Sequence, residues 1–228
     1  MKLSWLAPAV LLTSFAHSAQ AVEVSGTVTF TNDYRFRGIT QTAGDAAVQG
    51  SIDLGFDNGA FAGIWGSNVD FGDDANLEID YYGGYAGSLT DELGYAATLF
   101  YFQYPGYDAA DIDFFEVDLQ LFYKGATLTY AIAPDYVNSG EDGNYLALDY
   151  SMGITEQVNL DLHAGHSFGN YWDDFDIGAY SDFSVGVSTS FSGLDISAAY
   201  LFNDVDTDVD KGVGRNDNTL QVMLSRTF

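Results

Sequence analysis

Apolar and polar residues alternate along most of the chain beyond residue 21. In residues 115–123, for example, Phe, Val, Leu, Leu and Tyr alternate with Glu, Asp, Gln and Phe. A period of two is typical of β-strands with two unlike faces, and the period of helices is hard to find here. The pattern therefore predicts an all-β protein.

Twelve such segments can be delimited, most of them roughly twice as long as an ordinary globular strand of about five to six residues. They cover residues 23–37, 46–57, 60–69, 76–88, 93–104, 112–124, 126–134, 144–153, 157–168, 178–192, 194–203 and 218–228. The connections alternate between short turns, such as Asn58-Gly59, and longer polar, mostly acidic loops. Asn-Gly between alternating segments is a strong hairpin signal.

An even number of long strands with short turns at one end and long loops at the other is the layout of a bacterial outer-membrane barrel. We therefore expect a transmembrane antiparallel up-and-down β-barrel with short periplasmic turns and longer acidic extracellular loops. The last nine residues alternate and end on Phe228, like the signal that the barrel-assembly machinery reads. The alternative is a soluble β-sandwich, whose strands also alternate.

The first 21 residues have the features of a secretory signal peptide. Lys2 supplies the positive charge, an apolar run follows, and Ala19-Gln20-Ala21 is a small-x-small cleavage site. We expect residues 1–21 to be removed after export through the Sec pathway and residues 22–228 to form the barrel. No later run is apolar and long enough for a transmembrane helix.

The chain is strongly acidic, with 33 Asp and Glu, seven Lys and Arg and a formal net charge of −26. This charge argues against nucleic acid as a partner. The absence of cysteine excludes disulfides, thiolate metal sites and cysteine-based catalysis. Lipid, lipopolysaccharide, the assembly machinery and small solutes are the partners that we expect for an outer-membrane barrel.

Strand parity predicts which charges face the lumen, because a charge on the lipid face is costly. Arg35 and Arg37 share a face with Asp33 in the first predicted segment. They form either a charged constriction that filters solutes or structural counter-ions that hold an acidic wall together. The other pore-lining candidates are Asp53, Glu78, Asp80, Glu116, Asp118, Asp149 and Asp161, and Asp182 and Asp195 have the same parity.

Metal and catalytic chemistry have weaker signals. Asp204, Asp206 and Asp208 are weak calcium candidates, because this run lacks the glycine and the glutamate of an EF-hand loop. His163 and His166 would point to opposite faces of a strand, so a zinc site is not expected. His163 has an inward aspartate two residues away but no catalytic motif around it, and we expect neither an enzyme nor a cofactor.

Tyrosine and tryptophan are well represented, with 16 Tyr and three Trp. Interfacial girdles of a barrel use such residues, and so do sugar-binding platforms. The residues near the long-loop ends of the predicted strands are Tyr34, Trp65, Tyr104, Tyr136, Tyr145, Tyr171 and Tyr180.

Several motifs lie within residues 30–106, namely Tyr34-Arg35-Phe36-Arg37-Gly38-Ile39-Thr40-Gln41-Thr42 and Ala47-Val48-Gln49-Gly50, then residues 63–71, 78–85 and Tyr104-Pro105-Gly106. Together they resemble the TorF family of proposed porins. This resemblance implies an outer-membrane barrel of Gram-negative bacteria that acts as a pore, and it implies no particular solute.

The expected function is a porin-like channel for passive diffusion of small solutes that favours cations, because an acidic lumen concentrates them. Two alternatives stay open from the sequence. One is a non-conducting structural or adhesive barrel, and the other is a soluble secreted β-domain that binds sugar or calcium.

Overall fold

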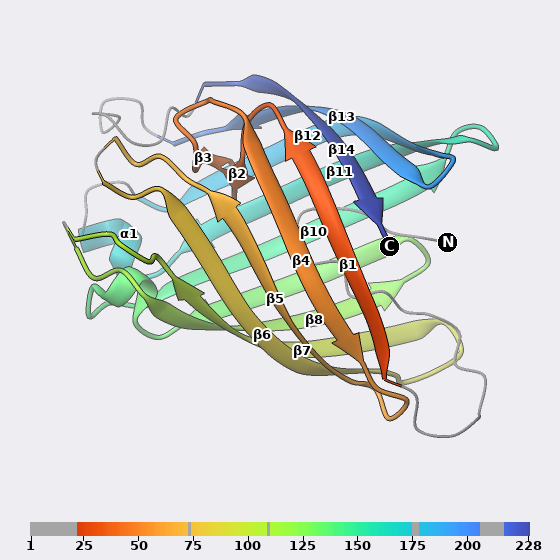
Figure 1. Ribbon diagram of the computed structural model, residues 1–228, viewed down its shortest axis with the longest axis horizontal. Helices are drawn as coiled ribbons and strands as arrows, with labels where there is room; N and C mark the ends of the chain where they lie inside the picture. Colours follow the sequence, from red (N-terminus) through yellow and green to blue (C-terminus); the bar gives the residue numbers. More distant parts are fainter. Residues whose placement is uncertain (1–21, 73, 109, 175–177, 206–216) are drawn as a thin grey trace.

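Twelve strands form a closed antiparallel barrel in the structure, a computed structural model that describes residues 22–72, 74–108, 110–174, 178–205 and 217–228 (Figure 1). Each strand pairs with its neighbours in sequence, and β1 pairs with both β4 and β14, which closes the sheet. A β-sandwich is therefore the wrong alternative. The barrel strands are β1 Glu23–Thr31, β4 Ala47–Gly55, β5 Ala60–Asn68, β6 Leu77–Ser88, β7 Leu93–Gln103, β8 Phe114–Tyr123, β9 Ala126–Ala133, β10 Gly143–Gly153, β11 Val158–Phe168, β12 Tyr180–Phe191, β13 Leu194–Asn203 and β14 Thr219–Thr227.

Short turns lie at one end of the barrel, where β1 begins and β14 ends, and the longer connections lie at the other (Figure 1). The long connections carry four small elements, which are β2 Arg35–Phe36, β3 Ile39–Thr40, η1 Tyr136–Asn138 and α1 Asn170–Asp174. Sequence patterning missed both helical turns because they are too short to show a helical period. No helix among the described residues has the length and apolar character needed to cross a membrane.

The outer surface of the barrel is apolar. Residues of one parity on each strand are exposed, and the largest of them are Val, Ile, Leu, Phe and Tyr, as Ile52, Leu99 and Val185 exemplify. Pairs of exposed rings lie near the long-loop end, where Tyr101 is 4.6 Å from Phe115, and others near the short-turn end, where Tyr85 is 6.4 Å from Tyr95. The exterior thus has the apolar band and aromatic borders of a lipid-facing surface.

The first strand is shorter than predicted. β1 ends at Thr31, whereas the alternating pattern extends to residue 37. Arg35 and Arg37 therefore do not face the lumen from the barrel wall. They belong to a separate hairpin, formed by β2 and β3, which folds into the barrel.

The barrel interior near the long loops contains a cluster of buried aromatic side chains, which we call the inner aromatic cluster. Phe100 and Phe102 of β7 point into it, which explains why both faces of this strand are apolar. The seven aromatic residues near the long-loop ends, for which a girdle and a sugar-binding platform were both open, do not form an outer girdle, because they are buried or pack on interior groups. The cluster consists of Tyr82, Phe100, Phe102, Phe114, Tyr136, Trp172 and Tyr180 with Ala133 and Val205.

Candidate functional site

The connection between β1 and β4 folds into the barrel as a two-stranded hairpin, residues 35–40, which we call the inner hairpin (Figure 1). Arg35 pairs with Thr40 and Phe36 with Ile39, so Arg37 and Gly38 form the turn. Their φ angles are 51° and 82°. Two successive left-handed residues are the geometry of a type I′ turn, in which glycine is favoured and arginine is uncommon.

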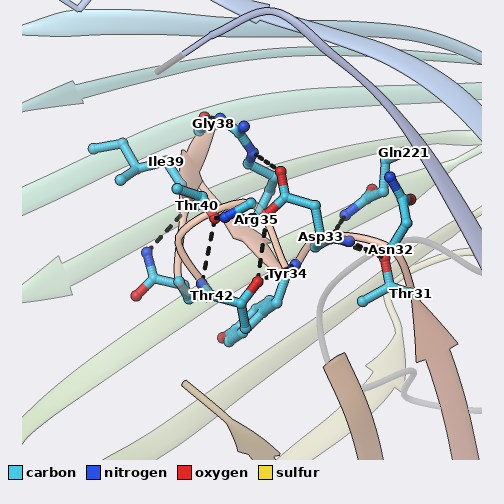
Figure 2. Close-up of polar contacts among 12 residues, drawn as sticks. Thr31, Asn32, Asp33, Tyr34, Arg35, Gly38, Ile39, Thr40, Thr42 and Gln221 are labelled. Carbon is cyan, nitrogen blue, oxygen red and sulfur yellow. Dashed lines mark hydrogen bonds and ion pairs between the residues drawn. The ribbon is translucent and has the colours of Figure 1, made fainter. Parts of the chain in front are cut away.

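Asp33 organises the base of the inner hairpin, as Figure 2 shows. Its Oδ2 accepts a hydrogen bond from Arg35 Nε at 2.6 Å, and its Oδ1 accepts one from Thr40 Oγ1 at 2.6 Å. Thr42 Oγ1 also donates to Oδ1, at 3.5 Å, and Gln221 Nε2 of β14 donates to the Asp33 carbonyl at 2.8 Å. The ion pair of Arg35 and Asp33 is therefore internal to this connection and serves to hold its shape.

The turn of the inner hairpin docks on the barrel wall at β12 and β13. The Tyr180 hydroxyl donates to the Arg37 carbonyl at 3.0 Å, and Asn203 Nδ2 donates to the Gly38 carbonyl at 3.1 Å. A Cβ atom on Gly38 would lie 2.6 Å from the Cβ of Asp182. Only glycine fits this close approach without displacement.

Arg37 makes the ion pair that joins the inner hairpin to β8. Its Nη2 lies 2.7 Å from Glu116 Oε1, and both side chains are almost fully buried. The guanidinium also stacks over the rings of Phe36 and Tyr145, each 4.5 Å from its centroid. Arg37 lies outside the barrel strands. Burial lowers its pKa, but the attraction and hydrogen bond of Glu116, together with the attraction of Tyr136 and Asp118, outweigh burial and raise the net pKa, so the guanidinium stays charged.

Glu116 and Asp118 of β8 act on this cation, and carboxyl groups of β6 lie near Glu116. Glu78, Asp80 and Glu116 are buried on the inner face, and the Tyr104 hydroxyl donates to Glu78 Oε1 at 2.8 Å. Asp118 lies close enough to Glu116 for the two carboxylates to interact. Oxygens of Asp80, Glu116 and Asp118 accept no hydrogen bond from any described residue. One arginine therefore lies beside several buried carboxyl groups.

His163 connects two further candidates on the inner face. Its Nδ1 lies 2.7 Å from Asp149 Oδ1, and its Nε2 lies 2.9 Å from Asp182 Oδ1. The Tyr145 hydroxyl is 2.9 Å from the same Nε2. The histidine thus bridges two carboxylates, an arrangement that strand parity alone did not predict. His166 is exposed on the outer face, as expected from its spacing.

The remaining inward candidates have short-range partners. Ser51 donates to Asp53 at 2.7 Å, and the Tyr82 hydroxyl also donates to Asp53. Ser151 donates to Asp161 at 2.6 Å. Asp53 and Asp161 lie on the inner face, but whether they line a conducting pore stays a prediction.

The calcium candidates do not form a metal site among the residues that the structure describes. Asp204 Oδ1 accepts a hydrogen bond from the Ser181 amide at 2.5 Å, which gives it a structural role between β12 and β13. Asp206 and Asp208 lie outside the described residues. Within the described part of the chain, no three His, Cys, Asp or Glu side chains are grouped to hold a metal ion.

Residues 15–228 match the profile of a bacterial family described as "Bacterial protein of unknown function (Gcw_chp)". The chain belongs to the Gcw_chp family. The narrower resemblance to the TorF family stays a prediction. No curated protein matches this Gcw_chp chain.

Solved structures that resemble this Gcw_chp protein have low sequence identity to it. The structure described as "NanC porin structure in rhombohedral crystal form" has a TM-score of 0.54 and 9% identity, over 90% of this chain and 98% of that chain. One described as "Unveiling the Mechanism Behind the in-meso Crystallization of Membrane Proteins" has a TM-score of 0.56 and 9% identity, over 90% and 83%. OprD from Pseudomonas aeruginosa has a TM-score of 0.44 and 10% identity, over 91% and 66%. The NanC likeness supports the twelve-stranded barrel fold.

Proposed function

We propose that this Gcw_chp protein is an outer-membrane barrel that acts as a porin-like passive channel for small solutes and favours cations. The observation that carries the proposal is the excess of buried carboxylates beside Arg37 on the inner face. Glu116 and Asp118 keep oxygens that no described residue neutralises by hydrogen bonding. Such a wall attracts cations and repels anions, most strongly at low ionic strength.

The outer surface supports the membrane location. Exposed apolar residues such as Ile52 and Leu99 encircle the barrel, and a soluble protein would have to solvate this large apolar area. Aromatic pairs lie near both ends of the strands, where the interfaces of a bilayer would be. The fold shared with the NanC porin supports the same class of protein. A passive channel of this kind needs no catalytic group or cofactor.

The proposed partners follow from this location. Lipid contacts the outer surface, and the assembly machinery reads the C-terminal strand that ends on Phe228. Lipopolysaccharide adjoins the long acidic loops, with divalent cations between its phosphates and the loop carboxylates. Export through the Sec pathway with cleavage after residue 21 belongs to the same proposal.

Single-channel recording in a planar bilayer tests the channel. Under a KCl gradient we expect a reversal potential that indicates K⁺ over Cl⁻. Asp161→Asn should reduce this preference, because it removes an aspartate from the inner face of β11. Asp91→Asn, in the exposed turn between β6 and β7, is the matched control and should leave it unchanged. A preference for Cl⁻ would refute the cation channel.

A second candidate is a non-conducting structural or adhesive barrel, and a specific observation favours it. The inner hairpin and the inner aromatic cluster fill much of the interior near the long loops. A barrel of this strand number lies between small filled barrels and open porins. If the wild-type protein and a variant with a disrupted inner hairpin are both silent in the bilayer, this second function replaces the first.

A further inference from the structure

A cavity of about 160 Å³ lies between the tip of the inner hairpin and the long loops. Two of its walls come from the hairpin, through Phe36 and Ile39, and the others from the loops after β5, β7 and β9. We call it the mouth cavity. Neither the barrel fold nor the carboxylate wall accounts for it.

The lining of the mouth cavity is mainly apolar. Phe71 contributes a side chain from the loop after β5, and Ile112 and Phe114 contribute theirs from the start of β8 and the residues just before it. The Phe114 ring is arranged edge to face with Tyr136, with 5.0 Å between centroids and an interplanar angle of 63°. Aromatic side chains in such arrangements offer faces and edges to a further ring.

The size of the mouth cavity selects a small ligand. An apolar protein cavity of about 150 Å³ is large enough for benzene. The mouth cavity has a similar volume, so it fits one six-membered ring with a short substituent. Longer chains and oligosaccharides are too large for it.

The polar groups at the cavity edge restrict the charge of the ligand. Tyr104 lines the cavity, and its hydroxyl is committed to the Glu78 carboxylate. Tyr180 also lines it, and its hydroxyl is committed to the Arg37 carbonyl. The guanidinium of Arg37 is itself paired with Glu116. Among the residues that the structure describes, no unpaired cation lies beside the cavity to receive an anion, while carboxyl groups lie behind its wall.

We propose that the mouth cavity binds one small ring-bearing molecule, aromatic or alicyclic, that carries no negative charge. A ring fills the apolar volume, and a neutral or cationic substituent is compatible with the adjoining carboxylates. Binding there does not depend on conduction, so the site exists equally in a channel and in a closed barrel. In a channel, an occupant would obstruct the long-loop end.

Isothermal titration of the detergent-solubilised full-length protein tests the site, with benzyl alcohol, benzylamine and benzoate as probes. The first two should give saturable binding of one molecule per chain, and benzoate should not. Ile112→Phe fills the cavity and should weaken binding by more than about tenfold. Ile64→Phe enlarges a lipid-facing side chain by the same change and should leave binding unchanged.

The proposal fails if benzoate binds as well as benzylamine, if no probe saturates, or if Ile112→Phe binds like wild type. Photolabelling of the wild-type protein with an aryl-diazirine amine gives a second test that needs no variant. Labels should appear in peptides that contain Phe71, Ile112 or Val137. Labels confined to lipid-facing segments would show partition into detergent and overturn the site.

Discussion

Arg37 of the inner hairpin and Glu116 of β8 form a buried ion pair, with 2.7 Å between Nη2 and Oε1. The two residues are 79 positions apart in the sequence. The pair links the hairpin to the barrel wall, so the charge of the interior and the position of the hairpin depend on each other.

Replacing Arg37 with Ala should change both the stability of the barrel and its ion selectivity. Removing one partner of a buried pair leaves an uncompensated charge on Glu116, at a cost of roughly 3–5 kcal/mol in the free energy of unfolding. The lumen also becomes more negative, so the reversal potential should move further toward the cation limit. Urea unfolding in detergent and bilayer recording measure the two effects. Arg226→Ala, near the end of β14, is the control that removes a cation elsewhere.

The double variant Arg37→Met with Glu116→Gln separates charge from packing. Replacing both partners of a buried pair by uncharged groups is often close to neutral for stability. We expect stability near wild type and a reversal potential near wild type as well, since one charge of each sign is removed. If Arg37→Ala lowers stability without moving the reversal potential, the arginine is a structural counter-ion only.

The barrel could be predicted from the sequence because each strand has an apolar outer face and a mostly polar inner face. Apolar and polar residues therefore alternate along the strand with a period of two. Asp80 and Glu116 lie on the inner face, and Leu99 and Val117 on the outer face, as strand parity requires. Eleven of the twelve barrel strands differ from the predicted segments only by small changes at their ends. Glycines and polar residues mark the turns between them. The aromatic interior was not predictable in this way, since Phe100 and Phe102 give β7 two apolar faces.

The inner hairpin could not be predicted from local pattern. Thr31, Asp33 and Arg35 continue the alternation of β1 without a break, so nothing local marks the end of the strand. The only signal is Arg37-Gly38, a weak two-residue turn. The contacts that draw the hairpin inward come from β12, β13 and β14, more than 140 positions away in the sequence.

Asp33→Asn should release the base of the inner hairpin. The change removes the charge that Arg35 pairs with and weakens the acceptor for Thr40. Trypsin reports the result directly, because it cleaves after Arg35 and Arg37, which the folded hairpin shields. We expect wild type to resist and Asp33→Asn to be cleaved there. Asp70→Asn, an exposed loop residue, should resist like wild type. Equal resistance of Asp33→Asn would mean that the network does not hold the hairpin.

Gly38→Ala and Gly106→Ala form a matched pair that isolates the docking contact. Both glycines have left-handed φ angles, 82° and 79°, so alanine costs each of them a similar backbone strain. Only at Gly38 does the new Cβ meet a neighbour, the Cβ of Asp182 at 2.6 Å, whereas nothing lies within 4 Å at Gly106. Gly38→Ala should therefore lose more unfolding free energy in urea titration, by about 1–3 kcal/mol. Equal losses would place the hairpin turn away from β12.

Leu99→Arg tests whether the outer face meets lipid. Leu99 lies in the middle of β7 and is half exposed on the outer surface. A charged arginine near the bilayer midplane costs about 2–4 kcal/mol, whereas near the interface it costs about 0–1 kcal/mol. Leu89→Arg, in the exposed turn between β6 and β7, is the interfacial control. Urea unfolding in lipid vesicles should show a large loss of unfolding free energy for Leu99→Arg but not for Leu89→Arg, because only the side chain at position 99 faces hydrocarbon. In water, an exposed leucine tolerates arginine, so similar small losses at both positions would contradict a membrane-spanning barrel.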